Sequence, residues 1–99
     1  MTLEWTYPAE SYLDQLPPEE RSKVLHAVQR LPASWDSLDN AQLNRITGDR
    51  ADLYSLRVGA DLRVLVSRHG DVITVVDVVR RSQIDGLRRL MGHRPAAAE

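Results

Sequence analysis

The sequence contains no cysteine, which excludes disulfide bonds, thiolate chemistry and cysteine-based metal sites and fits a reducing compartment. It also lacks a long hydrophobic run, because the longest apolar stretch, VITVVDVV, is far too short to cross a bilayer. The first residues, MTLEWTYPAE, contain neither a basic region nor an apolar core, so they are not typical of a signal peptide. We therefore expect a cytoplasmic protein without a membrane partner.

Motifs for metal or nucleotide chemistry are also missing. The sequence shows no nucleotide-binding loop, no metal-ligand spacing and no Ser/His/Asp arrangement, so we expect no metal and no cofactor. Its 99 residues, 42% hydrophobic and 27% charged, are typical of one ordinary globular domain. We assign residues 1–92 to that domain and residues 93–99 to a flexible tail.

Positive charge is concentrated in the second half of the chain. Residues 1–44 hold three basic and seven acidic side chains, whereas residues 45–94 hold ten arginines and six aspartates. Twelve of the 13 basic residues are arginine, whose planar guanidinium suits bidentate phosphate binding. The split indicates an anionic partner for the basic half, although codon bias would equally produce the excess of arginine.

Hydrophobic periodicity predicts a strand and two helices in the first third of the chain. Residues 2–7 alternate as a half-buried strand does. Residues 9–16 and 18–31 each carry one apolar stripe at helical spacing, with the second helix ending before Pro32. The two helices are expected to form a hairpin, and one short helical turn is expected within residues 41–47.

The rest of the chain is typical of antiparallel hairpins. Three strands are expected at residues 52–58, 62–69 and 72–80, separated by the turn sequences GAD and HGD. A short C-terminal helix is expected over residues 82–92. The prediction is therefore an α+β fold in which an N-terminal strand and a helical hairpin pack on a four-stranded, mainly antiparallel sheet.

Five arginines interrupt the apolar pattern of these strands: Arg57, Arg63, Arg68, Arg80 and Arg81. A three-residue first turn would place Arg57 directly across from Arg63. A two-residue second turn would bring Arg80 to the same face. Because like charges opposite one another in a sheet are unfavourable, such a face predicts a bound anion.

A second register leaves a structural explanation open. If the second turn has three residues, Arg63 faces Asp77, and the two form an ion pair within the sheet. Arg68 is expected to be a solvated hairpin residue, and Trp35 is expected to cap the helical hairpin.

The segment LNRITGDRADLYSLRVGADLRVLVSRHGDVITVVDVV, residues 43–79, resembles the core of the RelE/ParE superfamily of toxins from bacterial type II toxin–antitoxin modules. The strings LYSLRVG and DLRVL, the order of the elements and the chain length carry this resemblance, which covers residues 2 to about 84. It implies a RelE-like fold and a separate antitoxin protein as partner, since the chain has no acidic tail of its own.

The resemblance also implies a function, that of an endoribonuclease which cuts mRNA on the ribosome and inhibits translation. Arg57, Arg63, Arg80 and Arg81 fall at positions where family members bind the RNA phosphate. Arg63 and Arg81 would act in catalysis, by stabilising charge at phosphorus.

One departure from the family pattern leaves other functions open. Ribonuclease members commonly end with G-[HK]-R-x-x-x-Y, where this chain has VVRRSQID, with Val79 in place of the glycine and Ile84 or Asp85 in place of the tyrosine. His69 and His93 are the nearby candidates for acid–base chemistry. The alternatives are a ParE-like toxin that inhibits DNA gyrase without catalysis, and a non-toxic binding module with a RelE fold.

Overall fold

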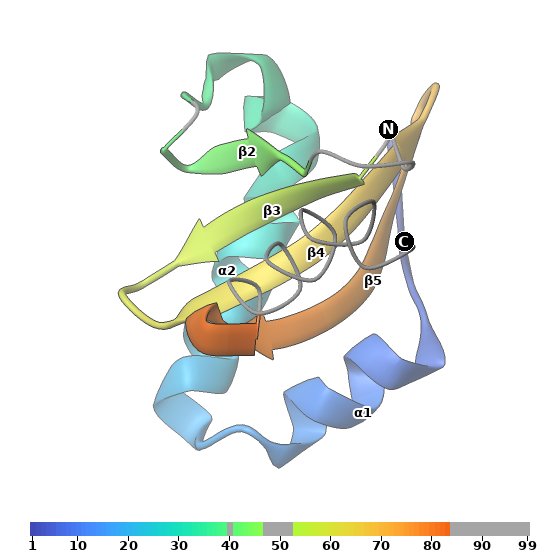
Figure 1. Cartoon of the computed structure of the whole chain (residues 1–99). Helices are drawn as coiled ribbons and strands as arrows, with labels where there is room; N and C mark the ends of the chain where they lie inside the picture. Colours follow the sequence, from blue (N-terminus) through green and yellow to red (C-terminus); the bar gives the residue numbers. More distant parts are fainter. Residues whose placement is uncertain (40, 47–52, 84–99) are drawn as a thin grey trace, which may run out of the picture.

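The computed structural model describes residues 1–39, 41–46 and 53–83 (Figure 1). The elements are β1 (Thr2–Trp5), α1 (Tyr7–Gln15), α2 (Pro18–Ser34), the 3-10 turn η1 (Trp35–Ser37), β2 (Leu43–Arg45), β3 (Leu53–Val58), β4 (Leu62–His69) and β5 (Val72–Arg80). Residues 81–83 are helical, and the rest of the predicted C-terminal helix and the tail lie outside the described residues. Within the described part of the chain, no helix is long and apolar enough to cross a bilayer.

The strands form one sheet in the order β1-β5-β4-β3-β2, with the two helices on one of its faces (Figure 1). β1 runs parallel to β5, and every other pair is antiparallel. The predicted α+β architecture is therefore confirmed, and the three predicted C-terminal strands match β3, β4 and β5 to within one residue.

The sheet has one strand more than the four predicted, because residues 43–45 form β2 rather than part of a helical turn. The Asp39 carboxylate accepts hydrogen bonds from the backbone N–H groups of Ala41 and Gln42, both at 3.0 Å, and so turns the chain toward the sheet. Pairing with β3 then buries Leu43 against the core. Tertiary pairing overrides local propensity in a segment this short.

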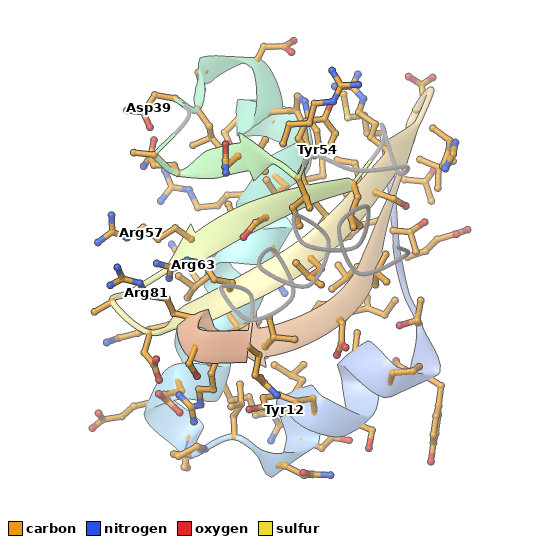
Figure 2. All side chains as sticks on the ribbon, in the orientation of Figure 1. Tyr12, Asp39, Tyr54, Arg57, Arg63 and Arg81 are labelled. Atoms are coloured by element: carbon orange, nitrogen blue, oxygen red, sulfur yellow. The ribbon has the colours of Figure 1, made fainter. Side chains whose placement is uncertain are left out.

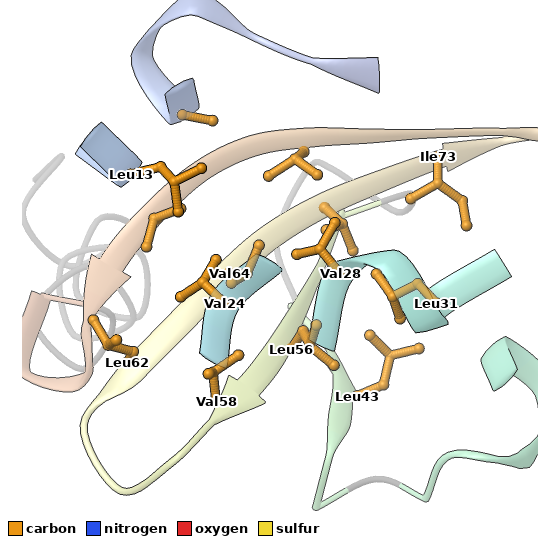
Figure 3. Packing of buried hydrophobic residues seen from close by; sticks show 14 of the residues in the cluster. Leu13, Val24, Val28, Leu31, Leu43, Leu56, Val58, Leu62, Val64 and Ile73 are labelled. Atoms are coloured by element: carbon orange, nitrogen blue, oxygen red, sulfur yellow. The ribbon is translucent and has the colours of Figure 1, made fainter. Parts of the chain in front are cut away.

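The core lies between α2 and the sheet (Figure 3). α2 contributes Val24, Val28 and Leu31, and its apolar stripe therefore matches the prediction. The sheet side consists of alternate strand residues with fully buried side chains: Val64, Val66, Ile73, Val75 and Val78. A smaller cluster forms on the opposite face around Ile46 and Leu65.

Helix α2 passes through Pro32 and ends at Ser34, so the prediction that it ends before Pro32 is wrong. A proline in the last turn removes one backbone hydrogen bond, whereas the fully buried Leu31 holds that turn on the core. The helix runs directly into η1, which carries Trp35.

A β-bulge interrupts the pairing of β4 with β5. Val66 pairs with Val75, but the preceding residue, Leu65, pairs with Asp77, so Val76 is the extra residue. The Thr6 hydroxyl, at the N-terminus of α1, donates a hydrogen bond of 2.6 Å to the Val76 carbonyl. Because strand side chains alternate, one extra residue reverses the faces of every residue that follows it.

Candidate functional site

The first hairpin places two arginines opposite each other. Arg57 of β3 pairs directly with Arg63 of β4, which confirms the predicted register. Gly59 has a φ of +67°, in the left-handed region that glycine adopts readily, and it shapes the turn between the strands. The Arg57 side chain is exposed and its Nε donates to the Gly59 carbonyl at 3.3 Å, while the half-buried Arg63 donates from Nη1 to the Leu62 carbonyl at 2.7 Å.

Arg81 lies at the same end of the sheet. Its backbone N–H donates to the Asp61 carbonyl at 2.6 Å, which ties the end of β5 to the β3–β4 turn. Figure 2 shows Arg57, Arg63 and Arg81 projecting from this end, and we call these three residues the arginine cluster. Guanidinium groups gathered at one end of a sheet can donate several hydrogen bonds to an anion.

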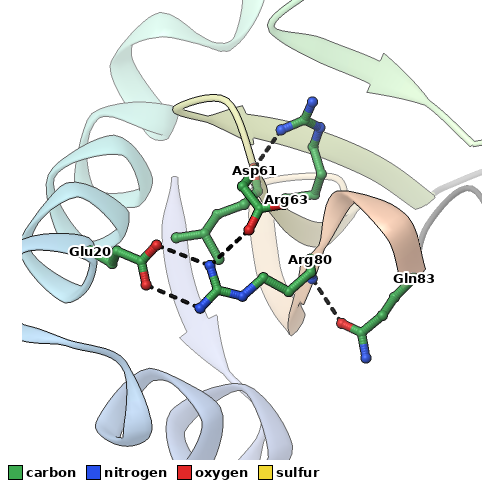
Figure 4. A network of polar contacts seen from close by, with 6 residues as sticks. Glu20, Asp61, Arg63, Arg80 and Gln83 are labelled. Carbon is green, nitrogen blue, oxygen red and sulfur yellow. Dashed lines mark hydrogen bonds and ion pairs between the residues drawn. The ribbon is translucent and has the colours of Figure 1, made fainter.

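Arg80 does not belong to this cluster, so the prediction that it shares a face with Arg57 and Arg63 is wrong. The bulge turns Arg80 toward the helices, opposite Leu62 in the register. Its guanidinium binds both carboxylate oxygens of Glu20, at 2.9 and 3.1 Å, and Asp61 at 3.0 Å (Figure 4). The hydrogen bonds from Arg80 lower the pKa of the Glu20 carboxyl, against the opposing effect of partial burial.

This ion-pair network connects three elements that border the arginine cluster. Glu20 lies in the first turn of α2, Asp61 in the β3–β4 turn and Arg80 at the end of β5. Glu20 in turn raises the pKa of the Arg80 guanidinium, so the pair is charged across the working range of pH. The chain itself therefore supplies two carboxylates for Arg80. Arg80 in turn holds β5, and with it Arg81, in place.

The alternative register, with Arg63 facing Asp77, is also wrong. Arg63 faces Val79, and Asp77 faces Leu65. The Asp77 carboxylate is half-buried and accepts a hydrogen bond of 2.8 Å from the backbone N–H of Val78. Asp77 therefore has a local partner at the bulge, and the structure does not pair it with Arg63.

The other end of the sheet carries the remaining arginine of the hairpins. Trp35, which we expected to cap the helical hairpin, packs edge-on against Tyr54, with ring centroids 5.0 Å apart, at the border of the core. The Arg68 guanidinium lies 5.2 Å from the centroid of the Trp35 ring. Arg68 is thus a half-buried cation–π partner and not the solvated residue that we expected.

Of the two histidines that the structure describes, His69 lies far from the arginine cluster and His26 lies near one of its members. His69 ends β4 and Arg63 nearly begins it, which places them about 20 Å apart along the strand. His26, which the sequence suggests is a surface or boundary residue of its helix, lines a hollow between α2 and β3 together with Arg57. His93 lies outside the described residues. The helical spacing of His26 with Lys23 and Arg30 is the sequence signal that could have drawn attention to this hollow.

Solved structures with a similar fold include a toxin–antitoxin complex and a toxin. The RelBE2 toxin–antitoxin complex of Mycobacterium tuberculosis matches 81% of this chain and 96% of its own, with a TM-score of 0.65 and 22% identity. The YoeB/ParE toxin of Agrobacterium tumefaciens matches 82% and 99%, with a TM-score of 0.65 and 19% identity. The archaeal RelE–RelB complex of Pyrococcus horikoshii matches 83% and 96%, with a TM-score of 0.62 and 23% identity.

The sequence matches no family model and no curated protein. The structural matches each cover more than nine-tenths of the other chain, so the likeness extends over nearly all of each matched chain. The chain therefore has the RelE-like fold, and the fold that the sequence resemblance predicts is confirmed.

Proposed function

We propose that this protein is the toxin of a type II toxin–antitoxin module and cleaves mRNA on the ribosome. The observation that carries the proposal is the arginine cluster at one end of a RelE-like sheet. Three guanidiniums from two strands and the segment after β5 offer several donors to one phosphate group. The arrangement favours binding of an RNA backbone over binding of a small uncharged substrate.

The cluster supports one part of the cleavage chemistry directly. In cleavage by the neighbouring 2′-hydroxyl, the 2′-oxygen attacks phosphorus and the bond to the 5′-oxygen breaks. Negative charge builds on the phosphate oxygens in between, and guanidiniums aimed at them stabilise that state. Arg63 and Arg81 have this role in the proposal, and Arg57 binds the phosphate.

Proton transfer is the other part. The 2′-hydroxyl loses a proton and the 5′-oxygen gains one, and both steps gain from a positioned acid or base. His69 is at the far end of β4 and takes no part. Within the described residues, His26 is the histidine that shares a hollow with a member of the cluster.

The cognate partner in this proposal is a separate antitoxin. Two of the matching structures above are complexes of a toxin with its antitoxin. An antitoxin that covers the arginine cluster with carboxylates would block the RNA site, because both ligands need the same cations.

The proposal can be tested by incubating the purified protein with ribosomes that carry a defined mRNA. Primer extension then maps the new RNA ends. The expected result is cleavage of the ribosome-bound mRNA, strongly reduced in Arg63→Ala and retained in Arg68→Ala as the matched arginine control. A parallel assay of DNA gyrase supercoiling covers the alternative. Inhibition of gyrase without RNA cleavage would replace the ribonuclease proposal with the ParE-like one.

A further inference from the structure

Two neighbouring hollows lie between α2 and β3, beside the arginine cluster. The first, of about 390 Å³, is lined by Lys23, His26 and Arg30 of α2 and by Arg57 of β3. The second, of about 230 Å³, shares Arg30 and Arg57 and extends to Gln42. Because the two hollows share residues, they form one surface, which we call the α2–β3 groove.

The groove is positively charged in a part of the chain that is otherwise acidic. Residues 1–44 hold seven acidic and three basic side chains, and two of those three, Lys23 and Arg30, line the groove. Of the described residues that line either hollow, none is Asp or Glu. Lys23, His26 and Arg30 are exposed and lie at i, i+3 and i+7, which places them along one face of the helix. This concentration of positive charge fits an anionic ligand.

The chemistry of the lining favours a nucleic-acid backbone over an acidic amphipathic peptide. The strand residues in the floor, Leu56 and Val58, are only 4% and 6% exposed, whereas Lys23, Arg30 and Arg57 supply a charged lining. Ser22 and Gln42 add polar groups that can bind phosphate and ribose oxygens. Arg57 belongs to the arginine cluster as well as to the groove, so the two sites are continuous.

We propose that the α2–β3 groove binds the sugar-phosphate backbone of single-stranded RNA that continues from the arginine cluster. The inference rests on the proposed function for its choice of RNA. Lys23 and Arg30 neutralise successive phosphates, and His26 lies between them on the same helix face. The contacts are to the backbone, so binding is independent of sequence and falls steeply with salt.

Fluorescence anisotropy with a short labelled oligouridylate, 2′-O-methylated so that it cannot be cleaved, tests the groove without ribosomes. Lys23→Ala and Arg30→Ala are each expected to weaken binding roughly tenfold. Each should also make the slope of log affinity against log salt shallower by about 0.7, the value for one contact on a single strand. Arg68→Ala is the matched control, because Arg68 lies near the far end of β4, where its guanidinium is 5.2 Å from the centroid of the Trp35 ring, and it lines neither hollow.

The outcomes separate this inference from the proposed function. Unchanged affinity and slope in Lys23→Ala and Arg30→Ala would overturn the groove, even where the protein cleaves ribosome-bound mRNA. A glutamate-rich peptide that binds more tightly than the oligonucleotide, with the same sensitivity to both variants, would also overturn it. Loss of RNA binding in both variants, with the control unaffected, supports the groove even where no cleavage is detected.

Discussion

Two neighbours on β4 should respond in opposite ways to replacement by alanine, because they point to opposite faces of the sheet. Val64 faces the core with 0% exposure, whereas Arg63 is half-buried on the other face. Arg63→Ala tests whether the arginine cluster is a binding site, and Val64→Ala shows what damage to the fold looks like. The two residues are adjacent in the sequence, so their alanine variants can be compared directly.

The expected change in stability can be worked out for each variant. Val64→Ala removes two buried carbon groups and leaves a cavity, at a cost of about 2 kcal/mol of unfolding free energy. That corresponds to a fall in Tm of roughly 10 °C for a domain of this size. Arg63→Ala loses the hydrogen bond to the Leu62 carbonyl, worth about 1 kcal/mol, and relieves the repulsion from Arg57, worth about 0.2–1 kcal/mol. The two effects nearly cancel, so Tm should stay within roughly 5 °C of the parent.

Activity should show the reverse order. Removal of one charged contact to phosphate costs about 1.5–3 kcal/mol, so Arg63→Ala should lower RNA cleavage about 10- to 100-fold. Val64→Ala should retain most activity at a temperature where it is folded. Thermal melts followed by circular dichroism, beside cleavage and growth-inhibition assays, measure both quantities. A fall in Tm for Arg63→Ala as large as that for Val64→Ala, with activity intact in the folded fraction, would refute the site and make Arg63 a structural residue.

Two further predictions concern contacts that hold the ends of the sheet. The pKa of Glu20 is lowered in the folded protein from its ordinary value of 4.5, so the contact with Arg80 stabilises the fold above that pH and is lost as pH falls through the lowered value. Glu20→Gln should therefore have a lower Tm than the parent at pH 7, with the difference shrinking as the pH falls below 4.5 and through the lowered pKa. A difference that is the same at every pH would contradict this. Trp35→Ala should lower the free energy of unfolding, measured in urea, by about 2 kcal/mol because it removes the edge-on contact with Tyr54. Trp35→Phe keeps an aromatic ring and should cost less than half as much. Equal losses in the two variants would show that the ring contact is not the cause.

The sequence was sufficient for the elements and for the first hairpin. In a strand every second side chain faces the core, and in a helix every third or fourth does, so the spacing of apolar residues along the sequence indicates the element. The helix α2 and the strands β3, β4 and β5 were therefore predicted closely. The three-residue turn before Leu62 fixes the pairing of Arg57 with Arg63, because register counts outward from a turn. β2 escaped prediction because it is only three residues long and pairs at an edge of the sheet.

What only the tertiary structure decided is the membership of the arginine cluster. The second turn was predicted correctly, with His69 opposite Val72, yet Arg80 faces the helices because Val76 bulges out of β5. The carbonyl of that bulge is bound by Thr6, at the start of α1, a contact between segments at opposite ends of the chain. One extra residue reverses the phase of a strand, and a distant hydroxyl is not part of any local pattern. The cations of α2 likewise come to lie beside Arg57 only because the helix packs across the sheet.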